Sequence, residues 1–155
     1  MSQLFLNQCG IVCALGSGVA MVRQRLLDDG ASGLSWTDEF SPPAIAQISE
    51  PAWQLPLGRV HADLPSMAHW PLAMQSRNNQ LALAALAQIR PAVDAAIAQY
   101  GSERVAVIIG TSTSGIDRTE YAMGEHVRHQ ALPPEFHYAQ QEMGSVADML
   151  ATELG

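Results

Sequence analysis

The sequence contains no lysine, and charged residues of any kind make up only 15% of its 155 residues. Eight basic side chains, all of them arginines, face 15 acidic ones, so the formal net charge is −7. A nucleic-acid-binding face needs clustered basic residues, and these arginines are scattered along the chain. The composition therefore argues against nucleic acid as a partner. The low charge predicts that part of the surface is covered by further protein.

Cysteines and long apolar runs are also scarce. Cys9 and Cys13 are the only cysteines, and four residues apart on one strand they would be about 13 Å apart, too far for a disulfide. A reduced, cytoplasmic protein is expected. No stretch reaches the about 18 consecutive apolar residues of a membrane span, and the apolar start lacks the basic segment of a signal peptide. We therefore expect no membrane span and a mature N-terminus.

Apolar residues make up 48% of the sequence, as in a globular domain. The most informative stretch is residues 104–116, Arg-Val-Ala-Val-Ile-Ile-Gly-Thr-Ser-Thr-Ser-Gly-Ile. Its Val- and Ile-rich part predicts a buried strand over residues 104–109. The strand leads through small residues into a helical pattern, an arrangement by which α/β proteins place backbone beside a ligand.

The remaining pattern alternates strands and helices. Ser17 and Ser76 precede two helical patterns and are expected to cap them. Pro91 lies inside the second of these helices and is expected to bend it. Residues 35–76 hold most of the prolines and all three tryptophans and show no sustained period, apart from a short strand expected at residues 57–62. The order predicts an α/β fold with parallel strands, built from a strand at 3–14, helices at 18–27 and 77–100, the strand at 104–109, and helices at 116–126 and 142–153.

Residues 10–16, Gly-Ile-Val-Cys-Ala-Leu-Gly, and residues 76–116 resemble the β-ketoacyl-[acyl-carrier-protein] synthases, which are condensing enzymes of the thiolase-like superfamily. The resemblance implies an α/β, thiolase-like fold in which each of two halves has a five-stranded mixed sheet with packed helices. It assigns residues 1–155 to an incomplete first half, the N-terminal part of the synthase domain. The irregular residues 35–76 fall where the family has a variable, loop-rich excursion.

The resemblance also implies a reaction, the decarboxylative condensation of an acyl group with malonyl-acyl carrier protein in fatty-acid or polyketide synthesis. In the family a nucleophilic cysteine and two catalytic histidines come later in the chain, and none of them maps onto this sequence. The chain alone is therefore expected to be an inactive portion of an acyltransferase. The alternative is a non-catalytic relative, a chain-length-factor-like partner that shapes the acyl tunnel of a true synthase.

Further expectations follow from the family. No cofactor is implied, because the substrates are carried on the phosphopantetheine of acyl carrier protein, the expected partner. A homodimer or a ketosynthase heterodimer is expected. The turn after residue 109 lies under the family's acyl pocket, with Thr113 at the gating position and Ile116 beside it, while Gln141 and Met143 would supply the opposite wall. Arg77 stands where the family carries basic residues that meet the carrier protein.

The residues themselves suggest three other chemistries. A serine hydrolase using Ser112 is a remote alternative, because a nucleophile elbow needs Gly-x-Ser-x-Gly and position 114 is serine. A phosphate loop needs a lysine, which the chain lacks. His126 and His129 have helical metal-ligand spacing, but no third ligand is set by local spacing, so no metal is expected. The structural alternative for the 110–115 turn is that its hydroxyl groups satisfy their own backbone.

Overall fold

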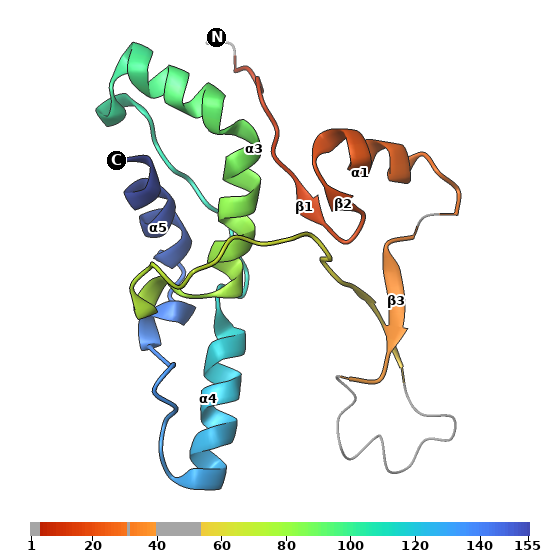
Figure 1. The fold of residues 1–155 in the computed structure, drawn as a ribbon, viewed down its shortest axis with the longest axis vertical. Helices are drawn as coiled ribbons and strands as arrows, with labels where there is room; N and C mark the ends of the chain where they lie inside the picture. Colours follow the sequence, from red (N-terminus) through yellow and green to blue (C-terminus); the bar gives the residue numbers. More distant parts are fainter. Residues whose placement is uncertain (1–3, 31, 40–53) are drawn as a thin grey trace. The chain divides into compact units, whose positions relative to one another are not determined.

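The computed structural model describes residues 4–30, 32–39 and 54–155. The chain divides into two compact units, which we describe separately (Figure 1). The hairpin unit comprises Cys9–Asp63, and the helical unit comprises Leu64–Gly155 together with the first eight residues.

Two short antiparallel pairs of strands make up the hairpin unit. β1 (Val12–Cys13) pairs with β2 (Gly16–Ser17), with Val12 opposite Ser17. β3 (Leu34–Thr37) pairs with β4 (Leu55–Gly58), with Leu34 opposite Gly58. The expected strand at 57–62 therefore begins two residues earlier, and the long strand at 3–14 is reduced to the two residues of β1 within the described part of the chain.

The chain reverses direction directly after β1, which sets the end of this strand at Cys13. Gly16 has a φ of 139°, which an L side chain rarely adopts, and a Cβ atom there would overlap the Met21 side chain. The chain therefore folds back at once into α1 (Val19–Leu26). The expectation that Ser17 caps this helix is wrong. Ser17 is paired in the hairpin, and the capping position is Gly18, whose backbone N–H donates to the carbonyl oxygen of Ile11 at 2.9 Å.

The helical unit is built around α3 (Arg77–Tyr100). Ser76 caps this helix as expected, since its Oγ accepts a hydrogen bond of 3.2 Å from the backbone N–H of Asn79. The helix continues through Pro91 and bends, as expected (Figure 1). It ends at Gly101, whose φ is 88°. By length and composition alone α3 could cross a membrane, a criterion that core helices of soluble proteins also meet.

Three shorter helices follow α3 in the chain after the short 3-10 turn η2 (Ser102–Arg104). They are α4 (Ile116–His129), the 3-10 turn η3 (Tyr138–Gln141) and α5 (Ser145–Leu154). The expected helices at 116–126 and 142–153 are thus present, the first three residues longer and the second starting three residues later. Another 3-10 turn, η1 (Leu72–Met74), precedes α3.

The prediction of a strand at 104–109 is wrong for the described chain. Residues 105–110 form no strand, and the side chain of Ile108 is 89% exposed. Val105 has extended backbone angles (φ −110°, ψ 117°), so this residue adopts the extended conformation that the sequence predicts. A strand also needs a neighbour to pair with its N–H and C=O groups, and the described residues provide none here. Both observed strand pairs are antiparallel, which corrects the expectation of parallel strands.

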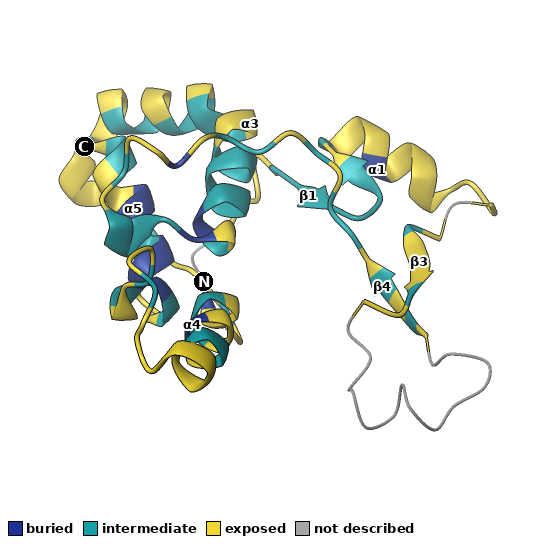
Figure 2. Ribbon diagram, turned by 60° about the horizontal axis from the view of Figure 1, so that its bottom comes forward, coloured by how far each residue is buried: buried dark blue, intermediate teal, exposed yellow. Residues whose placement is uncertain are grey.

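The core lies between α5 and α3 in the helical unit (Figure 2). Met149 of α5 is fully buried, and Val146 and Leu150 pack beside it. Arg90 of α3 forms an ion pair of 2.8 Å with Glu153 of α5 at the rim of this contact. Partly buried apolar side chains complete the core: Trp70, Met74, Ala82, Leu83, Leu86 and Val107.

Candidate functional site

The turn at residues 110–115 packs against η3 and the start of α3 through Gly115. Gly115 is buried, and a Cβ atom at this position would overlap the carbonyl oxygen of Gln140 and lie 3.1 Å from Cβ of Ser76. Any larger residue would push the turn away from η3. The glycine therefore fixes the turn that the sequence singles out as the candidate site.

A buried glutamine joins η3 to the segment that precedes α3. Gln140 is 1% exposed, and its Nε2 donates to the carbonyl oxygens of Leu72 at 3.1 Å and Gln75 at 2.9 Å. Its Oε1 accepts from the backbone N–H of His137 at 2.9 Å. A buried amide with these partners holds η1 and η3 together, because leaving any of them unpaired would cost free energy.

Asn79 forms a second buried polar contact, between α3 and α5. It is fully buried, and its Nδ2 donates to the carbonyl oxygen of Met74 at 2.8 Å and to Oγ of Ser145 at 3.4 Å. Its Oδ1 is buried and has no hydrogen-bond partner among the residues that the structure describes. Asn79 therefore joins the first turn of α3 to the first turn of α5, while its Oδ1 accepts no hydrogen bond from the described residues.

The hydroxyl groups of the turn are largely engaged in structure. Thr111 Oγ1 accepts from the backbone N–H of Ser114 at 3.1 Å, and Ser114 Oγ donates to the carbonyl oxygen of Glu142 at 2.8 Å. Ser114 adopts a left-handed φ of 47°, which this pair of hydrogen bonds stabilises. The structural alternative is thus confirmed for Thr111, whereas the Ser114 hydroxyl bonds backbone outside the turn, at Glu142. Ser112 is exposed, and within the described residues it has no hydrogen bond to a histidine that could act as its base.

The residues expected to line an acyl pocket lie around this turn and η3. Thr113, Ile116 and Met143 are exposed, and the backbone N–H of Ile116 donates to the carbonyl oxygen of Thr113 at 3.2 Å. Gln141 is half-buried, and its side chain is hydrogen-bonded to Oγ1 of Thr119 in α4 at 2.7 Å. The structure therefore brings Gln141 to α4, and a pocket shared by all four residues stays a prediction.

Arg77 is the first residue of α3 and is exposed. The contact predicted between Arg77 and a carrier protein stays a prediction as well.

One histidine of α4 lies beside a carboxylate. His129 Nε2 is 3.6 Å from a carboxylate oxygen of Glu125, which also pairs with Arg128. Glu125 is the main cause of a raised pKa of the Tyr121 hydroxyl. No group of metal-ligating side chains is present in the described ranges.

The buried polar residues Gln140, Asn79 and Ser145 were not predicted from the sequence. One signal for Asn79 was available, because an asparagine three residues after a capping serine lies in the first turn of an otherwise alanine-rich helix. Gln140 gave a local signal only for its contact with His137, three residues earlier, with which it forms a capping box. Its contacts with the carbonyl oxygens of Leu72 and Gln75 come from more than 60 residues away. Polar residues buried by long-range contacts have no local pattern.

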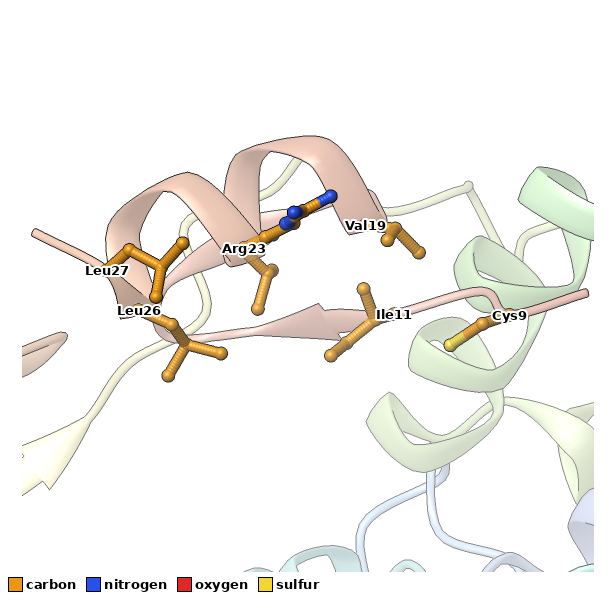
Figure 3. Close-up of a pocket in the computed structure, with 7 residues that line it drawn as sticks. Cys9, Ile11, Val19, Arg23, Leu26 and Leu27 are labelled. Carbon is orange, nitrogen blue, oxygen red and sulfur yellow. The ribbon is translucent and has the colours of Figure 1, made fainter.

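The hairpin unit contains a separate apolar pocket of about 420 Å³ between α1 and the segment that precedes β1 (Figure 3). Its one charged side chain is Arg23, and the others are apolar apart from a thiol. The lining residues are Cys9, Ile11, Val19, Val22, Arg23, Leu26 and Leu27.

The chain is similar to a solved structure described as a ketosynthase (ApeO) in complex with its chain length factor (ApeC) from Xenorhabdus doucetiae. The identity is 39% over 95% of this chain, with a TM-score of 0.78, and this chain spans only 35% of the length of that one. No known family profile matches the chain. No curated protein matches it either. The likeness supports the thiolase-like condensing family, without indicating which of the two partners this chain is closer to.

Proposed function

We propose that this chain is part of a ketosynthase-type condensing protein that acts in fatty-acid or polyketide synthesis. The observation that carries the proposal is the 39% identity over 95% of the chain to a chain of the ketosynthase and chain-length-factor complex. The small-residue turn at 110–115, which is fixed by the buried Gly115, agrees with the proposal, because the family resemblance assigns this turn to the acyl pocket.

In the proposed reaction, malonyl-carrier protein loses carbon dioxide, and the resulting carbanion attacks the carbonyl carbon of a cysteine-bound acyl group. The new carbon–carbon bond forms as the cysteine thiolate leaves. We assign none of these catalytic roles to residues 1–155. The chain would instead supply pocket wall at Thr113, Ile116, Gln141 and Met143, and a carrier-protein contact at Arg77. The protein would be a cytoplasmic dimer without a cofactor of its own.

A second candidate has equal support from the same observation. The similar structure is a complex of a ketosynthase with its chain length factor, so the likeness fits either subunit. A chain-length-factor-like subunit would not catalyse condensation. It would shape the acyl tunnel of a catalytic partner with which it forms a heterodimer.

The encoding gene and an assay together test the proposal. Reading the gene beyond the codon for Gly155 shows whether a strand-to-helix cysteine is encoded, as in a synthase, or replaced, as in a chain length factor. The chain itself, assayed with an acyl thioester and malonyl-carrier protein, should release no carbon dioxide. Release that survives replacement of both Cys9 and Cys13 but vanishes in Ser112→Ala would overturn the family assignment, as would labelling of Ser112 by a serine-reactive phosphonate.

A further inference from the structure

The apolar pocket of the hairpin unit is separate from the candidate turn, because every residue that lines it belongs to the hairpin unit. Val19, Val22 and Leu26 follow one another at spacings of three and four residues, which places them on one face of α1. Ile11, in the segment before β1, lies across from the helix (Figure 3). The volume of about 420 Å³ falls in the range of about 300–1,000 Å³ that is typical of small-molecule sites.

The pocket has a fixed inner side and an open apolar wall. The backbone N–H of Gly18 donates to the carbonyl oxygen of Ile11 at 2.9 Å, which holds the segment before β1 against the start of α1. Val22, at 4% exposed, forms the inner side. Leu26 and Leu27 are instead 67% and 77% exposed. A ligand that covers these leucines removes apolar surface from water, which favours binding.

Arg23 is the charged side chain that lines the pocket. It is exposed, and among the described residues it has neither a hydrogen bond nor an ion pair. Arg25 of the same helix differs, because its Nη1 donates to the carbonyl oxygen of Leu15 at 3.0 Å. The carboxylate of Asp28, just after α1, accepts from the backbone N–H of Gly30 at 3.1 Å. Arg23 is therefore available to pair with an anionic group of a ligand, and a guanidinium matches the geometry of a carboxylate.

We infer that this pocket binds a single-chain alkyl carboxylate. The alkyl chain lies against Ile11, Val19 and Leu26, and the carboxylate pairs with the guanidinium group of Arg23. The acyl group of a thioester has an uncharged carbonyl in place of the carboxylate, so Arg23 favours the free acid over the thioesters of the proposed condensation. The inference therefore goes beyond the proposed function and does not depend on it.

Cys9 reports directly on the occupancy of the pocket. It is exposed and lines the pocket, whereas Cys13 lies in β1 and does not line it. Decanoate, used below its micelle-forming concentration, should slow the alkylation of Cys9 by iodoacetamide several-fold and leave that of Cys13 unchanged. Mass spectrometry quantifies each cysteine separately. Equal slowing of both cysteines, or no slowing of Cys9, would overturn the inference. Protection of Cys9 that rises with protein concentration in the absence of decanoate would instead assign the pocket to a second copy of the chain.

The role of the charge is tested with decanol, which has the same chain length and no carboxylate. Arg23→Gln should raise the decanoate concentration that half-protects Cys9 by about tenfold and leave the value for decanol unchanged. Arg23→Lys keeps the charge and should restore most of the affinity. Arg25→Gln is the matched control, because it removes the same charge from the same helix outside the pocket. Equal losses in Arg23→Gln and Arg25→Gln, or decanol that protects the wild-type chain as well as decanoate does, would exclude pairing with Arg23.

A charge on the apolar wall tests the alkyl part of the site. Leu26→Glu replaces an exposed side chain, so folding should not depend on it, and it places a carboxylate where the alkyl chain lies. Decanoate should then no longer protect Cys9. Met21→Glu is the control on the same helix, because Met21 is 46% exposed and does not line the pocket. Undiminished protection in Leu26→Glu would overturn the inference, even if Arg23→Gln had failed to fold.

Discussion

The two units of the chain are stabilised in different ways. In the helical unit, apolar residues of α5 and buried polar residues such as Gln140 and Asn79 connect helices that are distant in sequence. In the hairpin unit, Val22 is the only described residue that is buried, and the described elements are two short pairs of strands and the helix α1. A unit with a core should resist unfolding cooperatively, whereas a two-stranded hairpin is marginal in water.

The largest expected effect tests this difference at the core of the helical unit. Met149→Ala removes a fully buried side chain and leaves a cavity between α5 and α3. The free energy of unfolding should fall by about 2–5 kcal/mol, measured by urea denaturation followed by circular dichroism.

The matched control is Met143→Ala, in which the replaced methionine is 56% exposed and the change should be within about 0.5 kcal/mol. Val22→Ala extends the comparison to the hairpin unit. It should leave the main helical transition unchanged and increase hydrogen exchange only around α1. A loss of helical stability in Val22→Ala as large as in Met149→Ala would show that the two units unfold together.

A smaller effect is expected where the candidate turn meets η3. In Gly115→Ala the added methyl group overlaps the carbonyl oxygen of Gln140, so backbone must shift, at a cost of about 1–3 kcal/mol in unfolding free energy. Gly110→Ala in the same turn is the control, because nothing lies within 4 Å of a Cβ atom there. Equal stabilities in thermal unfolding would mean that the turn is not held against η3.

The sequence predicted the helices well because their signals are local. The capping serine at 76, the apolar spacing through 77–100 and the stop at Gly101 all lie within or beside α3 itself. Helices α4 and α5 were predicted from sequence for the same reason, with ends that differ from the observed ends by up to three residues. The prediction that Ser17 caps α1 was wrong because Ser17 is paired with Val12 in the β1–β2 hairpin.

The strands were predicted poorly because a strand depends on its neighbours. Residues 104–109 have the composition of a buried strand, yet the described chain offers them no pairing partner, and Ile108 is exposed. For the candidate site, the turn and its glycine were identified from sequence, and the structure adds the contacts that hold the turn, namely the close approach of Gly115 to the backbone of Gln140 and the hydrogen bond from Ser114 Oγ to the carbonyl oxygen of Glu142. The acyl-pocket role of Thr113 rests on the family resemblance and stays a prediction.

The cap of α3 gives the next effect in size. Ser76→Ala removes the acceptor for the N–H of Asn79 and should lower the unfolding free energy by about 1 kcal/mol. Ser76→Asp keeps an acceptor and should lose little or nothing, which separates capping from packing of the buried Ser76 methylene. If alanine and aspartate destabilise equally, burial of Ser76 matters more than its hydrogen bond.

The smallest effect concerns the exposed surface of α4 rather than the core. The carboxylate of Glu125 raises the pKa of Tyr121 above its usual value of 10, with further contributions from partial burial and from Glu135. A raised pKa means that the folded chain favours the neutral phenol. The resulting stabilisation is present below pH 10 and is lost as the pH rises through the higher folded-state pKa. Ultraviolet titration of the three tyrosines should therefore show one late component that disappears in Tyr121→Phe. Glu125→Gln should shift that component to lower pH, and a late component that persists unchanged would assign it to Tyr100 or Tyr138 instead.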